Sequence, residues 1–276
     1  MDKLFSIIVV SLNPGDRLGE TLNSIKAQTY KDYEVIVKDG GSTDGSLDVI
    51  SSFEDMDVKL VEGSDTGIYD AMNIAFDNTS GRYVYFLNCG DSLYDDDVLK
   101  KTAEAVKAYE DKDAEAPAIF YGDIREMVTD SVVTSNPSID SFACFRNVPC
   151  HQACFYDRRL VKEHPFNTGY KVRADYEQFL WCYFEAKAKM THMGFTVALY
   201  EGNGYSESRD GKKISKEEHR DIIAKYMTPG QIFKYRMIMA VTLAPVRSAI
   251  SRSRTLAGPY NAIKKLMYKK ERRSDK

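Results

Sequence analysis

The sequence predicts an α/β protein with a doubly wound sheet, followed by a basic helical extension. Short β-branched runs alternate with helical patterns through the first hundred residues, as in parallel sheets covered by helices. The 276 residues, 43% hydrophobic and 29% charged, have the composition of an ordinary globular protein with length for a substantial core. The charge is uneven, because residues 230–276 carry a net +10 whereas residues 1–229 carry −13.

The first half of the chain reads as strand and helix in strict alternation. Continuous apolar runs such as residues 5–10 predict buried strands, and Leu18, Leu22 and Ile25 show the spacing of one helix face. The predicted order is strand 5–10, a helix from about 16, strand 33–37, helix 46–53, strand 58–61, helix 68–76, strand 83–87 and helix 98–109.

The pattern loosens after the charged stretch at 110–116. A strand at 119–121, a hairpin near 130–134, a helix at 175–186, an extended segment at 190–200 and three helical stretches from 215 are expected. We therefore divide the chain into a main domain at 1–214, with halves at about 1–115 and 116–214, and a helical basic extension at 215–276.

Several classes of protein are disfavoured by sequence features. The five cysteines are odd in number and form no CxxC, which argues against a disulfide framework or a zinc finger. The N-terminus lacks the pattern of a signal peptide, and no run reaches the roughly 18 apolar residues of a spanning helix. We therefore expect a cytoplasmic protein. Its basic C-terminus favours peripheral contact with an anionic membrane surface over nucleic acid, because the acidic body would repel that polymer.

Polar and acidic side chains collect where the predicted strands end. The carboxyl ends of parallel strands meet at one edge of a sheet, where open α/β sheets bind ligands. Each aspartate taken singly could equally cap a turn or helix, but the group together favours a ligand site. GxGxxG and GxxxxGK[ST] are both lacking, so an anionic nucleotide would need a divalent cation, Mn²⁺ or Mg²⁺. The group comprises Ser11, Asn13, Asp39, Asp65, Asp70, Asn88 and Asp91.

Six segments of the chain resemble glycosyltransferase family 2 in order and spacing. They are FSIIVVSLN, YEVIVKDGGSTDGS, SDTGIYDAMN, GRYVYFLNCGD, CHQACFY and KVRADYEQFL, and they span roughly residues 5–185. The likeness is greatest to bacterial transferases that build capsular, exopolysaccharide or O-antigen chains. It implies the GT-A fold, a Rossmann-like mixed sheet whose first half binds the nucleotide-sugar and whose second half binds the acceptor.

The same resemblance implies roles on the donor side. Asp39 would accept a hydrogen bond from the donor base, and Ser11 and Asn13 would line the same pocket. Asp65 and Asp70 fall where the family contacts the nucleotide-sugar.

A metal role is implied for one acid at the end of the fourth predicted strand. Asp91 matches the last acid of the family's DxD motif, so it would hold the Mn²⁺ or Mg²⁺ ion. The motif is incomplete here, because Asn88 and Gly90 stand where further acids would be expected. Asn88 would still line the donor site.

The resemblance also implies the catalytic base. Asp175 matches the acid of the family's ED motif, although Ala174 replaces the usual preceding glutamate. Without the resemblance, Asp175 could equally be an acid favoured by the N-terminal end of a helix. His151 and Gln152 would line the acceptor side, together with Arg173, which is placed to contact the diphosphate.

Three functions compete for these residues. The first is an inverting, metal-dependent hexosyl- or N-acetylhexosaminyltransferase that uses a UDP-sugar and a saccharide or lipid-linked acceptor. A sugar-nucleotide pyrophosphorylase would need a glycine-rich basic loop after the first strand, where SLNPGDRLGE offers only Arg17. A catalytically weak nucleotide-sugar-binding homologue would explain the thinned metal motif and Ala174.

Overall fold

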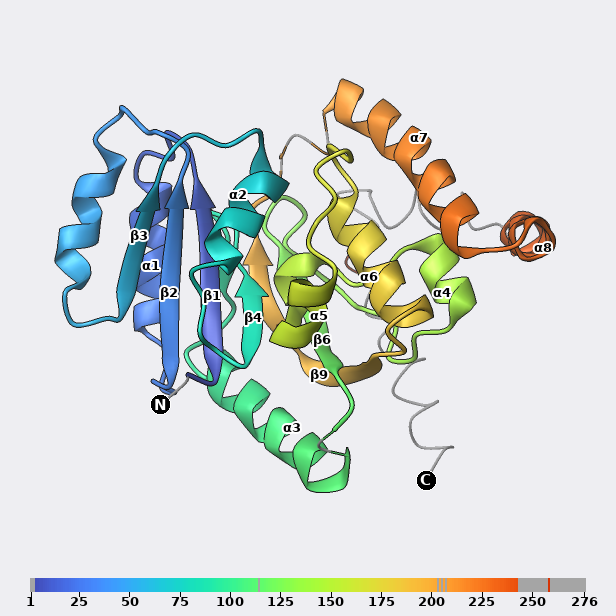
Figure 1. Cartoon of the computed structure of the whole chain (residues 1–276), viewed down its shortest axis with the longest axis horizontal. Coiled ribbons are helices and arrows are strands. Elements are labelled where there is room, and N and C mark those ends of the chain that lie inside the picture. Colours follow the sequence, from blue (N-terminus) through green and yellow to red (C-terminus); the bar gives the residue numbers. More distant parts are fainter. Residues whose placement is uncertain are drawn as a thin grey trace.

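The computed structural model describes residues 3–113, 115–202, 204, 206, 208–242 and 258. These residues form a mixed sheet with helices on both faces (Figure 1), which confirms the predicted fold class. The strand order is β3-β2-β1-β4-β8-β6-β9-β5, and β7 pairs with β6. The first four strands in this order are parallel, whereas β8 runs antiparallel to both β4 and β6.

The first half follows the predicted order, with one short strand, β5, that was not predicted. Its one change of type is η1, which is a 3-10 helix rather than an α-helix. This segment contains β-branched and serine residues, which are poor α-helix formers, and buries only Ser46 and Phe53. The elements are β1 Phe5–Ser11, α1 Arg17–Lys26, β2 Tyr33–Asp39, η1 Ser46–Phe53, β3 Val58–Glu62, α2 Ile68–Phe76, β4 Tyr83–Phe86, β5 Ser92–Leu93 and α3 Val98–Asp113.

The second half contains more elements than its sequence pattern predicts. The strand expected at 119–121 extends over nine residues, and the hairpin near 130–134 is present as β6 and β7. Strand β8 and three short helices were not predicted. The elements are β6 Ala118–Glu126, β7 Ser131–Val133, α4 Ser141–Arg146, η2 His151–Ala153, β8 Cys154–Asp157, α5 Arg158–Glu163, α6 Ala174–Phe184, β9 Lys189–Tyr200, α7 Arg209–Tyr226 and α8 Pro229–Val241.

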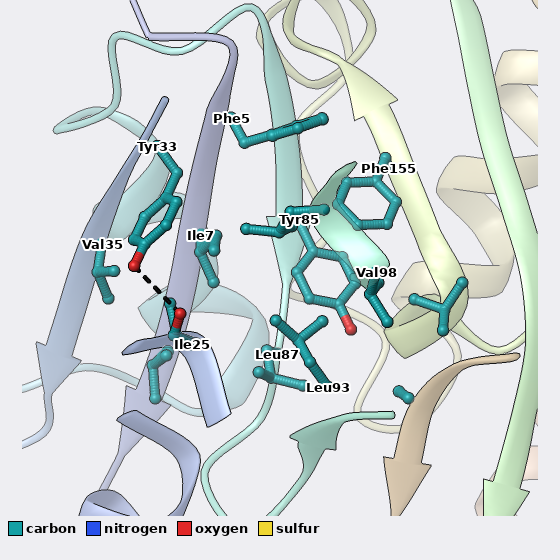
Figure 2. Packing of buried hydrophobic residues seen from close by; sticks show 14 of the residues in the cluster. Phe5, Ile7, Ile25, Tyr33, Val35, Tyr85, Leu87, Leu93, Val98 and Phe155 are labelled. Carbon is teal, nitrogen blue, oxygen red and sulfur yellow. Dashed lines mark hydrogen bonds between the residues drawn. The ribbon is translucent and has the colours of Figure 1, made fainter. Parts of the chain in front are cut away.

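The core has one layer on each face of the sheet. Alternate residues of β1 point to opposite faces, so Ile7 packs with the α1 and α3 layer and Ile8 with the α2 and α6 layer. Figure 2 shows the first layer, in which the buried Tyr33 hydroxyl donates to the carbonyl of Ile25 at 3.1 Å. Both layers hold β1 rigid, and β1 carries Ser11 at its carboxyl end.

Helices α7 and α8 pack against α4 and α6 through a third apolar cluster, which includes Tyr176, Ile223 and Tyr235. The predicted division between residues 214 and 215 falls inside α7, and the domain division itself stays a prediction. Helices α7 and α8 account for two of the three helical stretches expected from 215, and the third falls in 243–257 and 259–276, outside the described residues. Among the described residues, no helix is both long and apolar enough to cross a membrane.

Candidate active site

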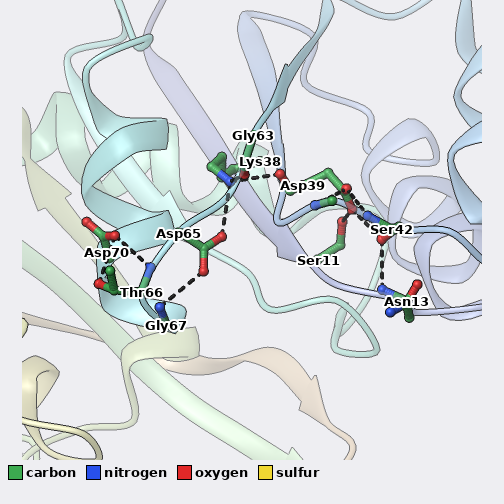
Figure 3. A network of polar contacts seen from close by, with 11 residues as sticks. Ser11, Asn13, Lys38, Asp39, Ser42, Gly63, Asp65, Thr66, Gly67 and Asp70 are labelled. Atoms are coloured by element: carbon green, nitrogen blue, oxygen red, sulfur yellow. Dashed lines mark hydrogen bonds and ion pairs between the residues drawn. The ribbon is translucent and has the colours of Figure 1, made fainter.

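Asp39 lies at the carboxyl end of β2, fully buried, and its two oxygens accept four hydrogen bonds (Figure 3). Oδ2 accepts from the hydroxyls of Ser11 and Ser42 at 3.0 and 2.6 Å. Oδ1 accepts from the backbone N–H groups of Gly41 and Ser42 at 2.8 and 2.6 Å. Burial alone would raise the pKa of Asp39, but these donors outweigh it and lower the pKa below its ordinary value. The carboxylate is therefore charged, and it joins the ends of β1 and β2.

Lys38 is a buried cation beside Asp39 that the sequence analysis did not select. Its side chain is 1% exposed, and Nζ donates to the Asp65 carboxylate at 3.1 Å. The same Nζ donates to the carbonyls of Asp39 and Gly63 at 2.7 and 2.6 Å, so all three of its protons have acceptors. Lys38 thereby fixes Asp65 against the sheet. The one available signal was a lysine within the apolar strand VIVKD.

Asn13 and Asp70 each order a loop at the carboxyl edge of the sheet. Asn13 has a φ of 46°, and its Oδ1 accepts from the backbone N–H of Thr43 at 2.9 Å. Asp70 accepts from the backbone N–H and hydroxyl of Thr66 at 2.8 and 2.9 Å. The structure thus brings Ser11, Asn13 and Asp39 into one network, while Asp70 stands in the first turn of α2.

Asp175 lies in the first turn of α6, where Tyr69 of α2 and His151 of η2 hold its carboxylate. The Tyr69 hydroxyl is 3.0 Å from Oδ1 and 2.8 Å from the carbonyl of Val172, and His151 Nδ1 is 3.2 Å from Oδ2. Burial by itself would raise the pKa of Asp175, but the hydrogen bonds from His151 and Tyr69 lower it. A quarter of the side chain is exposed. The result is an ionised, reachable carboxylate in a fixed orientation.

Asn88 extends this network from the end of β4. Because an ionised carboxylate only accepts, the proton in the contact with Asp175 belongs to His151 Nδ1, and Nε2 accepts from Asn88 Nδ2 at 3.2 Å. Asn88 Oδ1 is then buried and, within the described part of the chain, has no hydrogen-bond partner. An orphaned buried oxygen costs about 1–3 kcal/mol, which a ligand's donor or a cation would offset.

Asp91 is 4% exposed and holds three distant segments together. Its Oδ2 accepts from Gln152 Nε2 at 2.8 Å, and its Oδ1 accepts from the backbone N–H of Glu201 at 2.9 Å. Burial raises the pKa of Asp91 in spite of both bonds. The structure brings Asp91 and Gln152 together, with neither oxygen of Asp91 free of a donor.

A second carboxylate occupies the space beside Gly90, where the Asn88–Asp91 segment has no side chain. Gly90 has a φ of +100°, and a Cβ built there would lie 2.5 Å from Oε2 of Glu201. Glu201 follows the end of β9, and its Oε1 is 3.4 Å from Arg17 Nη2. Glu201 was not selected from the sequence, because it is 110 residues from the motif and lies in no recognisable pattern.

The donor atoms here suit a hard divalent cation. Asn88 Oδ1 lacks a partner among the described residues, and the Glu201 side chain is 38% exposed. No group of three or more His, Cys, Asp or Glu able to hold a metal occurs in those same residues. Mg²⁺ usually takes one or two carboxylates and completes its shell with substrate phosphates and water, so a sparse set of oxygens fits it.

Arg173 and Glu177 flank Asp175 but point elsewhere. Arg173 Nε donates to the carbonyl and hydroxyl of Ser215 at 2.9 and 2.8 Å, so its guanidinium is held against α7. Arg173 therefore does not join the Asn88–His151–Asp175 network. Glu177 is fully buried, with hydrogen bonds to His164, Lys225 and Tyr226, and shares no partner with Asp175.

Residues 6–143 match the family model described as Glycosyl transferase family 2. A PGL/p-HBAD biosynthesis glycosyltransferase of Mycobacterium bovis is 35% identical over 218 residues, which are 77% of this chain and 83% of that protein. A Mycobacterium tuberculosis protein of the same description matches equally well.

Solved structures share the fold at low identity. Staphylococcus aureus TarS has a TM-score of 0.64 and 20% identity over 91% of this chain, which spans 44% of the TarS chain. TarS 1–349 in complex with UDP-GlcNAc has a TM-score of 0.63 at 19% identity, and the match covers 91% of this chain and 74% of that one. Mannosyltransferase PcManGT from Pyrobaculum calidifontis, in complex with GDP-Man and Mn²⁺, has a TM-score of 0.63 at 18% identity, with 95% of this chain and 74% of that chain covered. These likenesses confirm the predicted GT-A fold.

Proposed function

The chain belongs to glycosyl transferase family 2, and from this membership we propose that it is an inverting transferase. It moves a hexosyl or N-acetylhexosaminyl group from a nucleotide-diphospho-sugar, taken to be a UDP-sugar, to a hydroxyl of a saccharide or lipid-linked acceptor. We place this reaction in the synthesis of a bacterial surface polysaccharide. The observation that carries the proposal is the ionised, partly exposed carboxylate of Asp175, oriented by Tyr69 and His151.

In the proposed reaction, Asp175 takes the proton of the acceptor hydroxyl as that oxygen attacks the anomeric carbon. The new C–O bond forms while the bond from the anomeric carbon to the diphosphate oxygen breaks, so the electron pair leaves with the nucleoside diphosphate. Attack from the face opposite the leaving group inverts the anomeric configuration. Tyr69 and His151 keep one carboxylate orientation, as a general base requires. His151 and Gln152 would lie on the acceptor side.

The donor would bind on the loops after β1, β2 and β3. Asp39 would help to bind the base of the donor nucleotide by fixing the loop at 40–43. It could accept a hydrogen bond from the base itself only if the hydroxyl of Ser11 or Ser42 rotated away from Oδ2. Ser11 and Asn13 would line the same pocket. Asp65 and Asp70 would contact the nucleotide-sugar from the loop held by Lys38.

A divalent cation, Mn²⁺ or Mg²⁺, would be held by Asn88 and Glu201 together with Asp91. When bound, it supplies positive charge that neutralises the charge developing on the diphosphate. The orphaned Asn88 oxygen and the Glu201 carboxylate beside Gly90 support this assignment. Because both oxygens of Asp91 already accept hydrogen bonds, we add Glu201 as a second carboxylate that shares the binding with Asp91.

We further propose that the enzyme works in the cytoplasm, at the inner face of the membrane. The basic residues between 230 and 276 support attraction to anionic lipids. Within that span, α8 exposes Phe233, Met237 and Val241 at four-residue spacing, which forms one apolar stripe on a helix.

The proposed function is tested with the full chain and a panel of UDP-, GDP- and dTDP-sugars, with and without Mn²⁺. A donor that binds only the folded state must raise the melting temperature. We expect a UDP-sugar to do so and to be turned over slowly to UDP in the presence of Mn²⁺. Stabilisation without any turnover would favour the second candidate, a binding homologue, which Gly90 and Ala174 also suggest. The absence of any donor effect would refute both.

A further inference from the structure

A basic pocket of about 480 Å³ lies between α4, the start of α6, α7 and α8. Its cations come from all four segments: Arg146, Arg173, Lys216, Arg220 and Arg236. Not one of these five forms an ion pair with a carboxylate elsewhere in the described residues. Five like charges around one pocket repel one another, and a bound anion would relieve that repulsion.

The pocket has a rigid floor. Phe145 and Ile223 are buried there, and His219 Nε2 donates to the carbonyl of Phe145 at 2.9 Å. The His219 ring stacks on Tyr176, with centroids 5.3 Å apart. Burial is the main cause of the lowered pKa of His219, and the charges of Arg173 and Arg236 lower this pKa further. The imidazole therefore senses the positive potential of the pocket.

The wall nearest the candidate base is tied to α7. Glu218 accepts from the backbone N–H groups of Lys171, Val172 and Arg173 at 2.7, 3.1 and 2.9 Å. Arg173 stands two residues before Asp175, so a group held in the pocket lies close along the chain to the residue that would receive the acceptor's proton. Arg173 thus faces this pocket rather than the Asn88–His151–Asp175 network.

We propose that this pocket binds a phosphate-ester group of the acceptor, an inference that rests on the proposed function. Guanidinium groups present paired N–H donors that match phosphate oxygens, and four of the five cations are arginines. The apolar floor accommodates the carbon atoms next to the ester. The phosphate belongs either to a lipid carrier or to a soluble acceptor.

Inorganic phosphate and the imidazole signals of the full-length protein provide the direct test. The chain has only four histidines, and His219→Gln identifies the signal of His219. We expect phosphate to raise the pKa of His219 in a saturable manner, whereas sodium chloride at the same ionic strength does not. Arg220→Gln with Arg236→Gln should weaken phosphate binding about tenfold, the loss of two charge-assisted contacts. Lys213→Gln with Lys234→Gln removes the same charge from α7 and α8 outside the pocket and should change it less than about twofold.

Vesicles of phosphatidylcholine, with and without phosphatidic acid, distinguish the two sources of phosphate. With a lipid source, the Arg220/Arg236 variant binds acidic vesicles more weakly than the Lys213/Lys234 variant does. With a soluble source, the two variants bind vesicles equally and differ only toward inorganic phosphate.

Three results would overturn the inference: a His219 response to phosphate that does not saturate, an equal response to sodium chloride, or an equal loss of phosphate affinity in both double variants. The melting-temperature shift with UDP-sugars, measured on the same proteins, tests the proposed function independently. If UDP-sugars raise the melting temperature but phosphate does not bind, only the phosphate-pocket inference is refuted. If UDP-sugars leave the melting temperature of the wild type unchanged, the proposed function is refuted.

Discussion

Replacing each of two acids on α6 should separate catalysis from stability. Asp175→Asn keeps the shape of the side chain and removes its basicity. The asparagine oxygen still accepts from Tyr69, and its amide faces His151 Nδ1, so His151 must move its proton to Nε2. If the side-chain amide of Asn88 rotates by half a turn, its Oδ1, which has no partner among the described residues, accepts a hydrogen bond from the new Nε2–H group. The network survives, so we expect an intact fold and unchanged donor binding.

The magnitudes for the two substitutions follow from their surroundings. A positioned general base contributes about 10²–10⁴ in rate, so sugar transfer by Asp175→Asn should fall at least about 100-fold. For Glu177, burial raises the pKa, but its bonds to His164, Lys225 and Tyr226 prevail and lower it from 4.5 to about 2. At about 1.4 kcal/mol per pH unit, this corresponds to about 3 kcal/mol of stability at neutral pH. Glu177→Gln should therefore lower the free energy of unfolding by about 3 kcal/mol and leave transfer largely intact.

The assays are single-turnover transfer with saturating donor and urea unfolding of both variants. UDP binding by calorimetry controls for an indirect loss of the donor site. Full turnover in Asp175→Asn, together with loss of turnover in Glu177→Gln, would show that the catalytic carboxylate had been chosen wrongly.

Three further predictions concern stability and the metal. The folded-state pKa of Glu177 is depressed, so its contribution to stability is complete above about pH 4.5 and is lost as the pH falls toward 2. The free energy of unfolding of the wild type should therefore fall more steeply with pH in this range, and Glu177→Gln should reduce that slope. Glu201→Gln should weaken Mn²⁺-dependent UDP binding by about 10-fold or more in calorimetry, and Asp91→Ala should abolish it; unchanged affinity in either variant removes that residue from the metal site. Lys38→Met leaves Asp65 and two carbonyls without their donor, so urea unfolding should show a free energy of unfolding lower by about 3 kcal/mol. A decrease of less than about 1 kcal/mol would contradict the role of Lys38 as a buried, paired cation.

Local sequence patterns were enough to predict the alternating elements of the first half. Helix α2 spans Ile68–Phe76 as predicted, and β1 and β2 extend only one and two residues further. These elements could be predicted because period-3.6 and buried-strand patterns depend on residues within one or two turns. For the same reason, Ser11 and Asp39 could be placed at adjacent strand ends, where the structure joins them by a hydrogen bond.

The tertiary structure alone decided which polar side chains meet. Strand β8 inserts between β4 and β6 in the opposite direction, and the short helix η2 just before it brings His151 to Asp175. The Glu201 carboxylate reaches Gly90 only because β9 pairs with β5 and ends beside the motif. No local pattern encodes such contacts, because they depend on strand order and direction, which are set by packing of the whole sheet. The sequence by itself thus determined the strands and the acids at their ends, and the sheet decided their partners.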